Sequence, residues 1–282
     1  MSDYITLCKP RVVLLMLLTS MVGMSLVPAH FFSWEIFFLG NIGIAFMACS
    51  AAVVNHLADQ RIDRMMTRTK NRPMAQGKVS NFSAALFASV LGTAGFCVLF
   101  FFTNTLTAVL TSLALVGYAG VYTLFLKHRT PQNIVIGGLA GAAPPLLGWV
   151  AMTGHIDLGA IVLLLIIFIW TPPHFWALAI DRVDEYAKAN VPMLPVTHGI
   201  SSTKTHMVVY TVILCLISLL PFVIGLSGWI YLVGVVLLNA RFLQLTIRLK
   251  KTNDPLLPKK AFRFSITYLM GLFVLLLMGR FL

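Results

Sequence analysis

Runs of about twenty apolar residues recur along the whole chain, and they limit its possible folds more than any other feature. An α-helix rises about 1.5 Å per residue, so a run of this length crosses the roughly 30 Å hydrocarbon core of a bilayer. The sequence therefore predicts an all-α, polytopic membrane protein. The nine runs that we expect to span the membrane are 11–29, 35–55, 82–102, 105–126, 133–152, 158–179, 205–225, 228–247 and 262–281.

The composition excludes a soluble globular domain. Of the 282 residues, 59% are hydrophobic and only 11% are charged, whereas soluble domains carry roughly 25% charged residues. One transmembrane domain covering residues 1–282 accounts for the whole length. The four cysteines are scattered without a C-x-x-C pair and three lie inside apolar runs, so we interpret them as small hydrophobic residues.

Loops rich in basic residues alternate along the chain with loops that contain none. Lys and Arg gather in the loops after the second, fourth, sixth and eighth runs, and the intervening loops contain none. Cytoplasmic loops carry such an excess of positive charge. We therefore predict a cytoplasmic N-terminus, a C-terminus outside, and a multi-pass protein of the bacterial cytoplasmic (inner) membrane.

Lys9 and Arg11 precede the first run, which we interpret as an uncleaved span. The net charge of +12 thus follows from topology, and no nucleic-acid partner is expected.

Three oxygen-bearing side chains at the end of the second run form the first candidate site. Asn55, Asp59 and Asp63 recur every four residues, which places them along one face of a helix. Carboxylate oxygens suit Mg²⁺, which binds proteins through a few such ligands together with substrate phosphates. The alternative is a helix end whose solvated acids pair with Arg61 and Arg64. We favour the metal site, because a matching acidic group occurs later in the chain.

That second acidic group follows the sixth run. It consists of Asp181, Asp184 and Glu185, which stand at the cytoplasmic end of their run as the first group does. The two groups open the two longest cytoplasmic loops, 55–80 and 181–204. We expect these loops to cap a shared site in which both acidic groups hold the metal.

Basic side chains close to these acids are expected to bind a diphosphate, whose charge exceeds what a metal ion neutralises. The alternative for each is a topology signal, and Lys78 is interpreted in that way. The candidate substrate-binding residues next to the two motifs and in the short loop after the fourth run are Arg64, Arg68, Arg72, Lys127, Arg182 and Tyr186.

A double proline inside the sixth run marks a further candidate. Pro172 and Pro173 precede His174, and prolines at membrane depth are usual where a helix lines a cavity. An ionisable group within a span is a functional candidate by default. His174 could ligate a metal porphyrin, act as a base or bond a freed carbonyl group. A second double proline, Pro144-Pro145 in the fifth run, would widen the same cavity.

The first motif and the residues after it resemble a known family. The pattern N-x-x-x-D-x-x-x-D followed by R-T-x-x-R-P, from Asn55 to Pro73, is similar to that of the UbiA-type intramembrane prenyltransferases. Further stretches resemble the branch of that superfamily that transfers a farnesyl group to haem. They are 127–138, 141–145, 171–176 and 191–195.

This resemblance implies nine helices around a central cavity, with capping loops over two acidic motifs. It implies Mg²⁺-assisted transfer of a farnesyl group from farnesyl diphosphate to a vinyl group of protohaem IX (haem b), with water addition, to give haem O. It also implies haem A synthase or a terminal oxidase under assembly as protein partners, and His174 as the haem contact. The implied metal and catalytic residues, with Asp184 as a competitor of Glu185, are Asn55, Asp59, Asp63, Lys127, Asp181 and Glu185.

Three other functions stay open on the residues alone. A quinone-type aromatic prenyltransferase would share the diphosphate site and differ in its acceptor. An ion-coupled secondary transporter would place its acids near the bilayer midplane, whereas these acids stand at the ends of runs. A haem-carrying electron-transfer protein would need facing pairs of histidines, and only His174 lies well inside a predicted span.

Overall fold

The computed structural model describes residues 2–67 and 69–281, apart from the side chains of His128 and Phe281. Arg68, a predicted diphosphate-binding residue, lies outside the described residues. Within the described part of the chain the regular structure is helical throughout. The helices are α1 (Ser2–Leu7), α2 (Pro10–Ser25), η1 (Ala29–Phe31), α3 (Trp34–Ala58), α4 (Gln60–Met65), α5 (Asn81–Phe102), α6 (Thr105–Val116), η2 (Gly117–Leu126), α7 (Lys127–Arg129), α8 (Asn133–Ala142), α9 (Pro144–Thr153), α10 (Leu158–Asp181), α11 (Val183–Lys188), α12 (Leu194–Thr197), α13 (Gly199–Ile217), α14 (Leu220–Val223), α15 (Trp229–Lys251) and α16 (Leu257–Phe281).

The helices confirm the prediction of an all-α polytopic membrane protein. Eight helical segments in the described chain are long and apolar enough to cross a membrane. Three of them are composite, because α6 continues into η2, α8 is followed by α9, and α13 by α14. The first predicted run forms α2, which is apolar but has only 16 residues.

Local sequence signals determine where several spans begin. The hydroxyl of Ser33 accepts a hydrogen bond from the backbone N–H of Ile36 at the start of α3, and Ser80 caps α5 in the same way. The side chain of Asn104 accepts from the N–H of Thr107 at the start of α6. These side chains satisfy backbone donors that the first helical turn leaves without partners.

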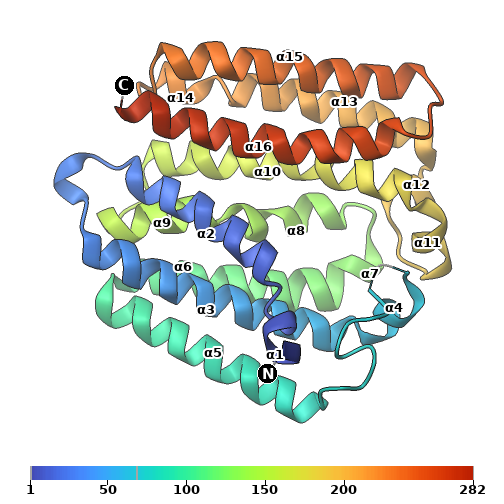
Figure 1. The fold of residues 1–282 in the computed structure, drawn as a ribbon, viewed down its shortest axis with the longest axis horizontal. Coiled ribbons are helices and arrows are strands. Elements are labelled where there is room, and N and C mark those ends of the chain that lie inside the picture. The colour runs from blue at the N-terminus through green and yellow to red at the C-terminus, as the bar shows by residue number, and fades with distance from the viewer. Residues whose placement is uncertain (1, 68, 282) are drawn as a thin grey trace.

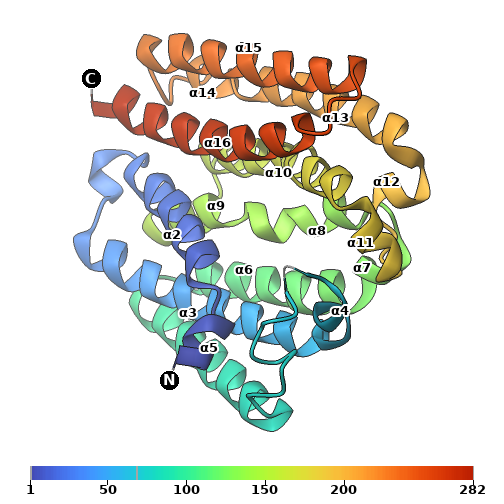
Figure 2. The ribbon, with the colours of Figure 1, turned by 45° about the vertical axis from the view of Figure 1, so that its right-hand side comes forward.

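The spans surround a central space (Figures 1 and 2). Helices α3, α5 and α6 pack together on one side, and α13, α15 and α16 on the other. Between them α10 packs against α8, α9, α13 and α16, while α2 packs against α9 and α3. α10 therefore has packing partners both in the group of α13 and α16 and among the inner helices α8 and α9.

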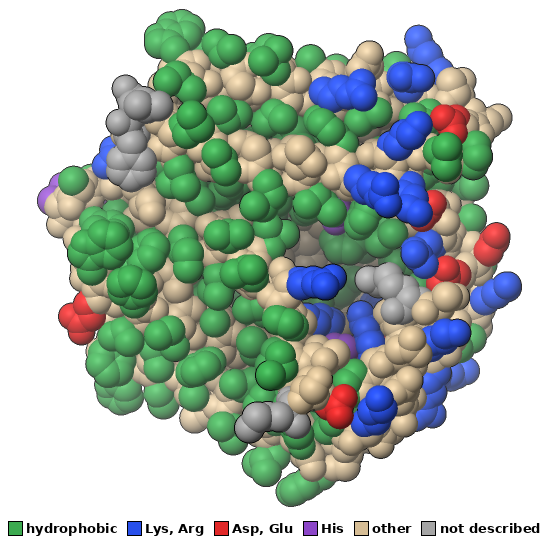
Figure 3. All heavy atoms as spheres, viewed as in Figure 1, with side chains coloured by type: hydrophobic (Ala, Val, Ile, Leu, Met, Phe, Trp, Pro, Cys, Tyr) green, Lys and Arg blue, Asp and Glu red, His purple; other side chains and the backbone are tan. Residues whose placement is uncertain are grey.

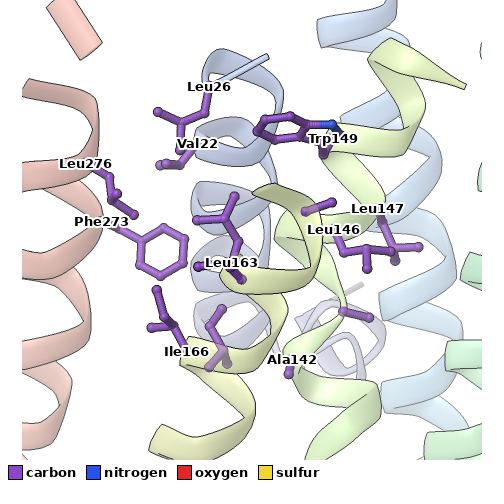
Figure 4. Packing of buried hydrophobic residues seen from close by; sticks show 14 of the residues in the cluster. Val22, Leu26, Ala142, Leu146, Leu147, Trp149, Leu163, Ile166, Phe273 and Leu276 are labelled. Carbon is purple, nitrogen blue, oxygen red and sulfur yellow. The ribbon is translucent and has the colours of Figure 1, made fainter. Parts of the chain in front are cut away.

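The largest buried cluster joins α2, α9, α10 and α16 (Figure 4). Val22 of α2 and Leu26, which directly follows α2, lie near Trp149 of α9, and Leu163 of α10 lies near Phe273 of α16. Lipid tails are as apolar as these side chains, so close packing contributes much of the association between membrane helices. The cluster fixes the four helices that flank the central space.

The two double prolines have different effects on the backbone. α10 continues through Pro172 and Pro173 to Asp181, although proline has no N–H to donate. The prediction that this span is helical is therefore confirmed, and the carbonyl groups one turn earlier lose their usual partners. In contrast, Pro144-Pro145 starts a new helix, because α8 ends at Ala142 and α9 begins at Pro144.

Candidate functional site

A cavity of about 510 Å³ occupies the space between the helices. It is lined by residues of α2, α3, α4, α6, η2, α7, α8, α9, α10, α11 and α16 and by Met66, Thr69, Arg72, Val191 and Met193 of the connecting loops. Figure 3 shows a hollow in the surface that Lys and Arg side chains border. The cavity wall combines an extensive apolar part with one cluster of charged side chains.

The first acidic motif lies in this wall, as its four-residue spacing predicts. Asn55 is in the last turn of α3, Asp59 caps that helix and Asp63 is in α4, and all three line the cavity. The backbone keeps helical hydrogen bonding across the junction, with Asp59 N–H bonded to Asn55 O at 3.0 Å and Asp63 N–H bonded to Asp59 O at 2.8 Å. The three side chains are buried, so the amide of Asn55 and the charges of Asp59 and Asp63 need partners within the protein.

Each carboxylate has its own cation. Lys127 Nζ lies 2.7 Å from Asp59 Oδ2, and Asn55 Nδ2 donates to the same oxygen at 2.9 Å. Arg72 NH1 donates to both oxygens of Asp63 at 2.9 Å. Lys127 comes from α7 and Arg72 from the loop after α4, so three separate segments meet here.

Lys9 completes this charged group, although its sequence position indicates only a topology signal. It caps α2 with a left-handed backbone (φ 51°), and its Nζ donates to Asn55 Oδ1. Burial, reinforced by the positive charge of Arg72, lowers the pKa of Lys9 to about 7. We call Lys9, Asn55, Asp59, Asp63, Arg72 and Lys127 the acid–base cluster.

The second acidic group has a different environment. Asp181 and Asp184 are exposed, and Glu185 is half-buried in an ion pair with Arg182 at 2.8 Å. None of these four residues is among those that line the cavity in the described chain. Tyr186, from the same motif, is buried and does line it. The structure therefore brings together the first motif and Tyr186, and it leaves Asp181, Asp184, Glu185 and Arg182 outside the cavity wall.

Two other predicted residues have clear positions. Arg64 is exposed and its Nε donates to the carbonyl oxygen of Ala75 at 3.0 Å, so it holds the first capping loop and does not line the cavity. Lys78 is exposed on the same loop. Thr69 of this loop is buried and lines the cavity, with its hydroxyl bonded to the carbonyl oxygen of Asp63 at 3.2 Å.

His174 lines the cavity on α10. Its ring stacks between Trp170, at 4.2 Å between centroids, and Phe262, at 4.7 Å. Nδ1 lies 2.6 Å from Ser265 Oγ on α16. No sequence pattern indicates Ser265, which is one small residue in an apolar run.

A π-helical segment contributes a pair of aromatic rings. In η2, Tyr118 and Tyr122 stack at 5.6 Å and both line the cavity. The hydroxyl of Thr123 bonds the Tyr118 carbonyl at 2.8 Å and accepts from Asn55 Nδ2 at 3.3 Å. A Cβ atom at Gly137 would overlap the ring of Tyr122. The sequence alone leaves these tyrosines between an interfacial position and a cavity position, and the structure places them at the cavity beside the acid–base cluster.

The donor set of the cluster fits a divalent cation held jointly with a substrate. Asp59 Oδ1 is buried and has no hydrogen-bond partner among the described residues. No group of three or more His, Cys, Asp or Glu side chains in the described chain could hold a metal alone. Mg²⁺ commonly binds through one or two carboxylates plus substrate phosphates, which is what Asp59 and Asp63 can offer.

The chain belongs to the UbiA prenyltransferase family, whose sequence pattern matches residues 16–274. A protein of Marinobacter nauticus called protoheme IX farnesyltransferase is 58% identical over 279 residues, which are 99% of this chain and 92% of that protein. The resemblance that the motifs indicate is thereby confirmed.

Solved structures share the fold at low sequence identity. A digeranylgeranylglyceryl phosphate synthase has a TM-score of 0.84 and 18% identity, with 99% of this chain and 98% of that chain covered. A UbiA homologue from Archaeoglobus fulgidus, bound to DMAPP and Mg²⁺, has a TM-score of 0.66 and 16% identity, with 97% and 99% covered. At these identities the likeness establishes the fold.

Proposed function

We infer that this chain transfers a farnesyl group from farnesyl diphosphate to a vinyl group of protohaem IX, with addition of water, to give haem O and diphosphate. The 58% identity to the M. nauticus farnesyltransferase along nearly the whole chain supports this activity. The observation that carries the chemistry is the buried acid–base cluster in the wall of an otherwise apolar cavity. The aromatic prenyltransferase and transporter alternatives are less well supported, because neither matches this relative.

The cluster would bind the diphosphate end of the substrate. Lys127 and Arg72 are charge-assisted donors that can turn from their carboxylates to phosphate oxygens. Asp59 and Asp63 would hold Mg²⁺, which supplies positive charge to the departing diphosphate. The C1–O bond of the farnesyl group then breaks with its electron pair leaving on diphosphate, and fixed positive charge around that group stabilises this step.

The apolar wall would bind the farnesyl chain and the haem. Val13, Ile44, Leu115, Leu147 and Ile167 are apolar residues of the cavity wall, and they give a hydrocarbon chain a site without water. Tyr118 and Tyr122 line the cavity beside the cluster, where the allylic carbon would be attacked. A vinyl group of haem is the nucleophile, and water adds afterwards.

We propose that His174 contacts the haem and serves as a ligand of its iron. Loops 64–80 and 182–204 are proposed to cap the cytoplasmic side, so that water is excluded early and admitted late. For the second acidic group, we propose that Asp181, Asp184 and Glu185 reach the metal–diphosphate site when this cap closes over the cavity. Glu185 Oε2 and Arg182 Nε are buried without a hydrogen-bond partner among the described residues, so this pair has free bonding capacity.

The protein is a multi-pass membrane protein with bacterial relatives. We propose the bacterial cytoplasmic membrane as its location, and haem A synthase or a terminal oxidase under assembly as the proteins that receive its product. The location follows from the alternating charges of the loops, and the receiving proteins follow from the product, since haem O must pass to a protein that uses it.

The function is tested by incubating the purified protein with protohaem, farnesyl diphosphate and Mg²⁺ and measuring the molecular mass of the haem by mass spectrometry. We expect haem heavier by a farnesyl group plus water, and no product when EDTA removes the metal. Asp59→Ala and Asp63→Ala should abolish transfer while the folded protein stays in the membrane. Glu35→Ala, an exposed acid in the first turn of α3, is the matched control and should keep activity.

Two outcomes would contradict the proposal. Unchanged haem together with prenylation of a hydroxybenzoate would indicate a quinone-type enzyme. Farnesyl transfer that persists in Asp59→Ala or Asp63→Ala would exclude the cluster as the metal–diphosphate site.

A further inference from the structure

We propose that Ser265 is a positioning residue that holds His174 in one tautomer, with the proton on Nδ1 and the lone pair of Nε2 available to the haem. This inference rests on the proposed function, since haem is the group that His174 would meet. Ser265 stands on α16 and His174 on α10, 91 residues apart in sequence. Both side chains are buried.

The direction of the hydrogen bond follows from three atoms. Ser265 Oγ lies 2.7 Å from the carbonyl oxygen of Phe262 and 2.6 Å from His174 Nδ1. A carbonyl oxygen can only accept, and a hydroxyl group has a single hydrogen. Two oxygens at 2.7 Å repel each other unless a hydrogen lies between them, so the serine hydrogen belongs to the Phe262 carbonyl. His174 Nδ1 must then be the donor.

This tautomer determines what the ring can do. A neutral imidazole that donates from Nδ1 carries its lone pair on Nε2. The ring lines the cavity, and Nε2 has no hydrogen-bond partner among the described residues. A histidine that ligates a metal commonly donates its other N–H to a neighbouring acceptor, which orients the ring and raises its basicity. Ser265 is placed to be that acceptor.

Further contacts prevent the ring from turning. Trp170 stacks on one face of His174 with 19° between the ring planes, and Phe262 lies at 27°. Trp170 Nε1 donates to the backbone carbonyl of Ser265 at 2.8 Å. Ser265 therefore contacts both ring systems, through its backbone and its hydroxyl, and it joins α10 to α16 at the cavity wall.

The test is binding of ferric protohaem to the purified protein without farnesyl diphosphate. We expect a nitrogen-ligated absorption spectrum that His174→Ala loses. Ser265→Ala should weaken haem binding by about 10- to 100-fold, the usual effect of removing a partner of a ligating histidine. It should also lower the Fe–N(His) stretching frequency of the ferrous complex, which loss of packing alone would not do. Ser265→Thr restores the hydroxyl and should restore both readouts.

Thr211→Ala is the matched control. Its hydroxyl is also buried and bonds a carbonyl of its own helix, Met207 O at 2.7 Å, but it does not line the cavity. Haem affinity and stretching frequency in Ser265→Ala equal to those of Thr211→Ala would overturn the proposal. An unchanged nitrogen-ligated spectrum in His174→Ala would also overturn it. Because these measurements need no turnover, they are separate from a failure to form haem O.

Discussion

At the scale of single residues, the site depends on pairing buried charges. Asp59 and Asp63 would be costly in a membrane protein without Lys127 and Arg72, because unpaired buried charge is strongly destabilising. The pairs also keep the cations close to where diphosphate would bind. The same side chains thus support the folded state and the proposed chemistry.

The Asp59–Lys127 pair gives a residue-scale prediction. Lys127→Met should destabilise the metal-free protein by about 3 kcal/mol, because Asp59 is left as an uncompensated buried charge. Thermal unfolding in detergent with EDTA measures this. The double variant Asp59→Asn with Lys127→Met removes both charges and should recover most of the loss, and neither variant should transfer farnesyl. A single variant as stable as the wild type would contradict the pairing.

Sequence reasoning found many of the residues in the cavity wall, but not all. Asn55, Asp59 and Asp63 stand out because carboxylate and amide groups are rare at the ends of apolar runs, and Arg72 and Lys127 because they are basic residues in the adjoining loops. His174 stands out because it is an ionisable group after a double proline inside a run. Lys9 does not stand out as a site residue, since a lysine before an apolar run is equally well explained by membrane topology. Its left-handed backbone, which turns it into the cavity, has no signature in the neighbouring residues.

At the scale of elements, small residues set the distance between α2 and α9. A Cβ atom at Gly148 would overlap the backbone oxygen of Ser20, and one at Gly23 would overlap that of Pro145. Small residues let membrane helices approach until their backbones touch. This contact positions α2, and with it Lys9, against the cavity.

Gly148→Ala should therefore force α2 and α9 apart. We expect a loss of at least about 1–3 kcal/mol, as for other overpacked cores, seen as a lower melting temperature in detergent. Gly141→Ala is the control, because a Cβ atom there has no neighbour within 4 Å. That substitution should be neutral or slightly stabilising. Equal melting temperatures for the two variants would mean that the close contact does not exist.

At the scale of the whole molecule, the positively charged side chains are concentrated at one end of the helix bundle. In Figure 3 most Lys and Arg side chains lie toward the end of the bundle that carries α4, α7 and α11 in Figure 1. The acid–base cluster is formed by segments of this end. If it faces the cytoplasm, as the loop charges predict, a diphosphate reaches the cluster directly from that compartment.

Reporter fusions to the full chain test this topology. An N-terminal fluorescent protein should fluoresce, which requires the cytoplasm. A C-terminal alkaline phosphatase should be active, which requires the outside, whereas a C-terminal fluorescent protein should stay dark. The reverse pattern would show that the charged end faces outward.

The membrane class, the helical spans and the first acidic motif can be predicted from the sequence, because hydrophobic run length and residue spacing are local properties. Which of the charged residues share the cavity depends on the packing of the helices. The fold adds Lys9 to the first motif, leaves Asp181, Asp184 and Glu185 outside the cavity wall, and sets Ser265 against His174. These pairings join residues that are far apart in the sequence, so they depend on how distant helices pack. That packing rests on the steric fit of small residues and aromatic rings, which produces no periodic pattern in the sequence.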